Sequence, residues 1–145
     1  MITPNKQKLI WLFSLSRSKK RFFQIAYDFF SIIFAFFLAL ALLLETFNFF
    51  YLLDTYIGLL IAITVTLLIF IVNGFYNNIT RYVSISTAIN IAISSALSSA
   101  ILLSIILLLN LKIPMSASLI FGIIMCMFLA GMRLFIRYLS QNISY

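Results

Sequence analysis

Residues 22–44, FFQIAYDFFSIIFAFFLALALLL, form a long apolar run that follows directly on the basic residues Lys19, Lys20 and Arg21. A helix needs about 20 predominantly apolar residues to cross the hydrocarbon core of a bilayer, and this run is long enough to do so. Basic residues next to a span tend to stay on the cytoplasmic side. The stretch therefore predicts a membrane-spanning helix that enters the bilayer from the cytoplasm.

Three further apolar runs predict spans at about 55–72, 88–109 and 114–138. Of the ten basic residues, nine lie before the first span, between the second and third, or at the end of the fourth; only Lys112 lies on the other side. The positive-inside rule then places both termini in the cytoplasm. We expect an all-α membrane protein, a four-helix transmembrane bundle over residues 22–138, with residues 139–145 beginning a cytoplasmic linker.

The composition supports the bilayer as the solvent of this chain. Hydrophobic residues make up 64% of it and charged residues 9%, which leaves too little polar surface to cover a water-soluble globule. The net charge of +7 comes from clusters at the ends of spans, so the expected partners are anionic lipid head groups. A nucleic-acid-binding protein would need a folded basic face, and we expect no such partner.

Few residue types are present that could carry chemistry. The chain has no histidine, and its only acids are Asp28, Glu45 and Asp54, so no histidine base and no convincing pair of carboxylates is available. Cys126 is the single cysteine, which excludes a disulfide framework and a cysteine metal site. The four glycines are too scattered for a phosphate-binding loop. We expect no catalytic, cofactor-binding or metal site in the chain.

Residues 1–21 form a basic leader that also holds Trp11 and several apolar residues. Two interpretations are equally open, an interfacial helix lying in the head-group layer and a disordered basic segment. The small residues Ala39 and Ala41 have the spacing of a signal-peptide cleavage site. However, the apolar run is too long for a signal core, so an uncleaved signal anchor fits better.

Small residues recur at every fourth position in the later spans and predict the faces along which the helices pack. These stripes are Gly58, Ala62 and Thr66 on the second span; Ala92, Ala96, Ala100 and Ser104 on the third; and Ser118, Gly122, Cys126 and Ala130 on the fourth. In lipid, close backbone approach along such stripes is a main source of helix association. Short connections predict that successive helices are antiparallel neighbours. The sequence leaves open whether the bundle forms a homo-oligomer.

Asp28 is the one acid within the first turns of a span, and a buried carboxylate needs a partner. Because the start of the first span and the end of the fourth share a face, we expect an interfacial ion pair of Asp28 with Arg133 or Arg137. The basic residues at these two places can also meet lipid phosphates or fix the topology. They are Arg17, Lys19, Lys20, Arg21, Arg133 and Arg137.

Several spaced motifs resemble one protein family. They are Lys19-Lys20-Arg21 before an aromatic span with Asp28, the loop from Gly74-Phe75-Tyr76 to Arg81-Tyr82-Val83-Ser84, Ile113-Pro114 at the start of the fourth span, and Gly131 to Arg137 at its end. Together they resemble the N-terminal membrane region of the CapD-like polysaccharide biosynthesis proteins, which are bacterial nucleotide-sugar 4,6-dehydratases and epimerases. Where the first span of that family often ends in an arginine, this chain has Leu42-Leu43-Leu44-Glu45.

The resemblance implies an anchor domain in the bacterial cytoplasmic membrane. In that family a cytoplasmic domain follows, binds NAD(P) and a UDP-sugar, and would lie beyond Tyr145, so none of its cofactor or catalytic residues falls in this chain. Membrane enzymes of glycan assembly are the implied partners. Two alternatives are the membrane region of a polyprenyl-phosphate sugar-phosphate transferase and a free-standing small transporter or flippase.

Overall fold

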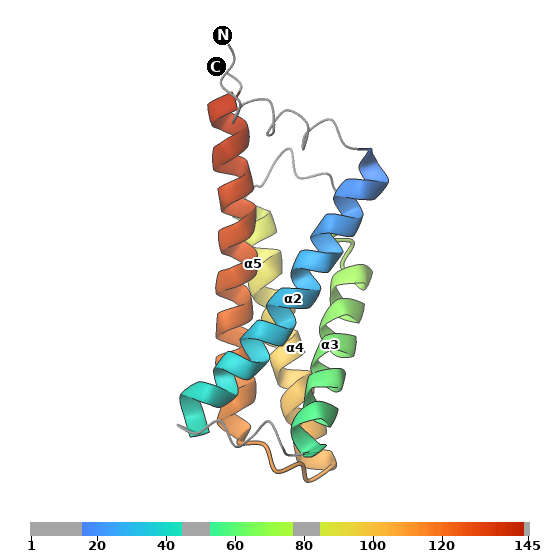
Figure 1. Cartoon of the computed structure of the whole chain (residues 1–145), viewed down its shortest axis with the longest axis vertical. Coiled ribbons are helices and arrows are strands. Elements are labelled where there is room, and N and C mark those ends of the chain that lie inside the picture. Colours follow the sequence, from blue (N-terminus) through green and yellow to red (C-terminus); the bar gives the residue numbers. More distant parts are fainter. Residues whose placement is uncertain (1–15, 45–52, 77–84, 144–145) are drawn as a thin grey trace.

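The computed structural model describes residues 16–44, 53–76 and 85–143, which form four α-helices (Figure 1). The helices are α2 (Arg17–Leu44), α3 (Leu53–Val72), α4 (Ile85–Leu108) and α5 (Met115–Ile143). Each is long and apolar enough to cross a membrane. The prediction of an all-helical chain with four apolar spans is therefore confirmed.

The helix ends differ somewhat from the expected spans. Helix α2 begins at Arg17, so residues 17–21 belong to a helix rather than to the leader, and α5 continues to Ile143. Residues 1–15, which include Trp11 and most of the proposed interfacial helix, lie outside the described part of the chain. Long basic side chains at the helix ends can extend toward the head-group layer, so a helix can continue past the apolar run.

The four helices form a ring in which each one packs on the next and α5 packs on α2. Successive helices run in opposite directions, so the start of α2, the end of α3 and the end of α5 lie at one end of the bundle (Figure 1). Helix α2 crosses the bundle obliquely, from the end of α3 toward the start of α5. We call the end that holds Arg17–Arg21, Asn73–Tyr76 and Arg133–Arg137 the basic end.

Helix α3 ends in a Schellman turn. Gly74 adopts a positive φ of 67°, its amide donates to the carbonyl oxygen of Ile71, and the Phe75 amide donates to that of Phe70. A hydrophobic contact usually accompanies this turn, and here the rings of Phe70 and Phe75 meet edge to face with centroids 5.3 Å apart. The turn reverses the chain and brings Phe75 and Tyr76 under the basic end of the bundle.

Helix α4 ends in the same kind of turn, with Asn110 in the left-handed position at φ 48°. The Leu111 amide donates to the carbonyl oxygen of Ile106. The Lys112 amide donates to a carboxylate oxygen of Asp54 at the start of α3, 3.1 Å away. Pro114 immediately precedes α5, where its missing amide hydrogen costs little. The Asp54 bond joins the start of α3 to the α4–α5 connection, at the end of the bundle opposite the basic end.

The small-residue stripe on α3 is confirmed, because Gly58, Ala62 and Thr66 are buried. A Cβ on Gly58 would collide with Ile113, and would lie 3.2 Å from Cζ of Phe36. On α5, Ser118 and Gly122 are likewise buried, and Cys126 and Ala130 are half-buried.

The stripe expected on α4 is wrong. Ala92, Ala96, Ala100 and Ser104 face outward, and the buried face carries Ser94, Ser95, Ser98 and Ser99 instead. The hydroxyls of the last three donate to the carbonyl oxygens of Ala92, Ser94 and Ser118. By facing inward, Ser99 gains an acceptor on α5, whereas an alanine methyl group can face lipid at no cost.

Candidate functional site

A buried polar cluster lies at the basic end and joins three segments far apart in the sequence. It contains Asp28 from α2, Phe75 and Tyr76 from the turn after α3, and Arg133 from α5. Asp28 shares a helix face with the buried Ile32, Ala35 and Ala39, which follow it at helical spacing. The same periodicity that buries the apolar side of α2 therefore carries the carboxylate inside.

Asp28 is 1% exposed, and its Oδ2 accepts a hydrogen bond from the Tyr76 hydroxyl at 2.8 Å. Burial raises the pKa of the Tyr76 phenol above its ordinary value, and the charge of Asp28 raises it further. The phenol therefore stays protonated and remains a donor at physiological pH. This bond supplies the carboxylate with one of the partners that a buried charge requires.

Arg133 is 6% exposed, and its guanidinium carbon lies 4.6 Å from the ring centroid of Phe75. A desolvated cation–π contact of this kind contributes about 2 kcal/mol. Arg133 and Asp28 also attract each other electrostatically. The structure thus brings the two expected partners into one cluster, with Tyr76 as the residue that hydrogen-bonds the carboxylate. A direct Asp28–Arg133 ion pair stays a prediction.

The other basic residues lie around this cluster rather than within it. Arg21 is exposed, and its Nε donates to the backbone carbonyl oxygen of Tyr76 at 3.0 Å. Lys19 and Arg137 are exposed, whereas Lys20 is half-buried. The side chain of Arg17 lies outside the described part of the structure. Arg133 therefore departs most from the expected contact with lipid head groups, because its side chain is turned into the bundle.

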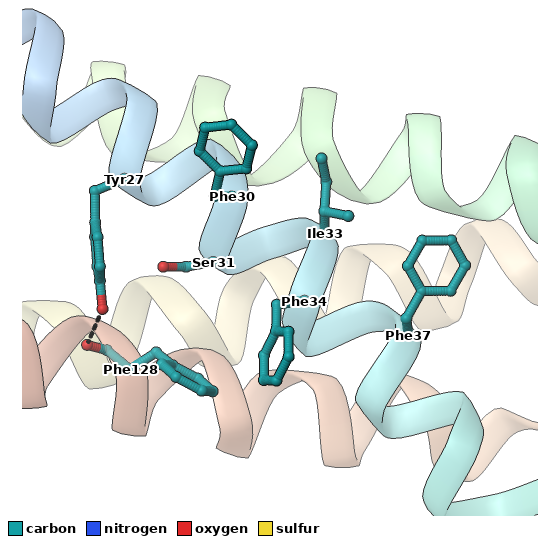
Figure 2. Close-up of a pocket in the computed structure, with 7 residues that line it drawn as sticks. All are labelled: Tyr27, Phe30, Ser31, Ile33, Phe34, Phe37 and Phe128. Atoms are coloured by element: carbon teal, nitrogen blue, oxygen red, sulfur yellow. Dashed lines mark hydrogen bonds between the residues drawn. The ribbon is translucent and has the colours of Figure 1, made fainter.

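An aromatic groove lies next to this cluster, between α2 and α5 (Figure 2). Four phenylalanines line it, namely Phe30, Phe34, Phe37 and Phe128, together with Ile33. The Tyr27 hydroxyl bridges the two helices by donating to the carbonyl oxygen of Phe128 at 3.4 Å. Ser31 points into the groove beside this bridge.

Sequence reasoning missed the groove and the roles of Phe75 and Tyr76. The sequence Asn73-Gly74-Phe75 did contain a signal for the position of Phe75, since a glycine at the end of a helix followed by an aromatic residue is typical of a Schellman turn. Nothing in the sequence alone indicates that Tyr27, Ser31 and Phe128 lie together, because the contact joins helices about 100 residues apart.

The polar groups of the cluster are one carboxylate, one phenol and one guanidinium. Within residues 16–44, 53–76 and 85–143, no group of three or more His, Cys, Asp or Glu side chains could hold a metal ion. Cys126, the free thiol, is half-buried in α5. No protein-family model, curated protein or solved structure matches this chain. The resemblance described above therefore depends on its motif residues alone.

Proposed function

We propose that this chain is the membrane-anchoring domain of a bacterial nucleotide-sugar 4,6-dehydratase or epimerase of polysaccharide biosynthesis. One observation carries the proposal. Three of the motifs on which the resemblance depends, which contain Asp28, Gly74-Phe75-Tyr76 and Arg133, meet in a single buried cluster. Contact between these residues is what the proposal expects of motifs that together maintain one anchor domain.

The arrangement of charge supports the same proposal. The basic end would face the cytoplasm under the positive-inside rule, and α5 ends there. A catalytic domain that followed Tyr145 would then lie at the cytoplasmic surface of the inner membrane, next to the enzymes that use its product. Tethering raises the local concentration of an enzyme without any new contact. The NAD(P) that the resemblance implies belongs to that domain, and no residue of this chain is assigned to it.

Transport receives less support from the interior of the bundle. A polar path would need hydroxyls that are available to a solute, whereas those of Ser95, Ser98 and Ser99 donate to backbone carbonyl oxygens. Bonds of this kind make serine a packing residue in membrane helices. The charged residues also lie near the two ends of the bundle, most of them at the basic end, rather than at the midplane, where transporters bind their substrates.

The first test measures the mass of the native polypeptide in its source membrane, with an antibody against the loop around residues 77–78. A product several times heavier than 16.6 kDa that binds a nicotinamide cofactor is the expected result. A heavy product with sugar-phosphate transferase activity and no nicotinamide binding would favour the alternative family. A product near 16.6 kDa would contradict the anchoring proposal.

The second test removes residues 1–145 from the complete enzyme. We expect the remaining protein to turn over its sugar nucleotide in solution while glycan assembly in cells is impaired. A control enzyme that carries an unrelated four-span anchor should restore assembly if anchoring alone is needed. Loss of turnover by the purified catalytic domain would show that the bundle does more than anchor.

A further inference from the structure

We draw no further inference here: the strongest candidate, the outward-facing patch of small residues on α4 formed by Ala92, Ala96, Ala100 and Ser104, is an unpartnered face of the bundle, and nothing in the structure shows what covers it.

Discussion

Replacing Gly122 by alanine tests the close packing of α5 on α4 beside Ser99. A Cβ at this position would lie 2.7 Å from Cβ of Ser99, 3.0 Å from its Oγ, and 3.5 Å from the carbonyl oxygen of Ser95. The nearest atom is a Cβ, which cannot rotate away, so the two helices must separate. The Ser99 hydrogen bond to the Ser118 carbonyl oxygen, 2.7 Å long, would lengthen as they do so.

The magnitude follows from three contributions. Overpacking of a close contact costs about 1–3 kcal/mol, and weakening the Ser99 hydrogen bond costs about 1 kcal/mol. Replacing a helical glycine by alanine returns about 1 kcal/mol through helix propensity. We therefore expect Gly122→Ala to lower the free energy of unfolding by about 1–3 kcal/mol. The assay is reversible unfolding in mixed detergent micelles, followed by circular dichroism.

Gly131 provides a matched control on the same helix, because a Cβ there would meet no atom within 4 Å. Gly131→Ala should leave the free energy of unfolding unchanged or raise it slightly. Adding Ser99→Gly to Gly122→Ala removes the atom responsible for the clash and should recover part of the loss. Equal stability of the Gly122→Ala and Gly131→Ala variants would refute the close approach of α4 and α5.

Three further predictions concern the exposed face of α4, the buried cluster and the topology. Ala96→Leu should change the free energy of unfolding by less than about 0.5 kcal/mol, because Ala96 is exposed; a large loss would show that this face packs inside the bundle. Tyr76→Phe removes the donor to Asp28 and should cost about 1–3 kcal/mol. Because the pKa of Tyr76 is raised on folding, the native chain should lose stability as the pH rises above about 10, and this loss should be smaller in Tyr76→Phe. Reporter fusions at positions 48 and 112 should report the outside and those at 78 and 145 the inside; the reverse pattern would place the basic end outside.

The helices could be predicted from the sequence because each depends on a local pattern. A long uncharged run in lipid must satisfy its own backbone groups, and a helix does so within one segment. Turn chemistry is also local, so Asn73-Gly74 and Pro114 marked helix boundaries that the structure contains. The gathering of Asp28 and Arg133 at one end followed from topology alone, since an antiparallel four-span chain brings the start of the first helix to the end of the last.

The face that each helix turns inward was harder to predict, and α4 shows why. Its alanine stripe and its serine face both place small residues at helical spacing, so periodicity could not choose between them. The choice depends on hydrogen-bond partners supplied by other segments, such as the Ser118 carbonyl oxygen, which accepts from Ser99, and the Asn73 side-chain amide, which donates to Ser94. A sequence pattern contains no information about partners that lie on another helix.

The sequence by itself therefore determined the solvent of this protein, its four membrane-length helices and the end at which most of its basic residues gather, because these depend on composition and on order along the chain. Only the tertiary structure decided that Tyr76 hydrogen-bonds Asp28, that Arg133 turns inward onto Phe75, and that Tyr27, Ser31 and Phe128 form one groove. Each of these contacts joins segments dozens of residues apart. Their geometry depends on the crossing of α2 over the bundle and on the turn at Gly74, neither of which a local pattern fixes.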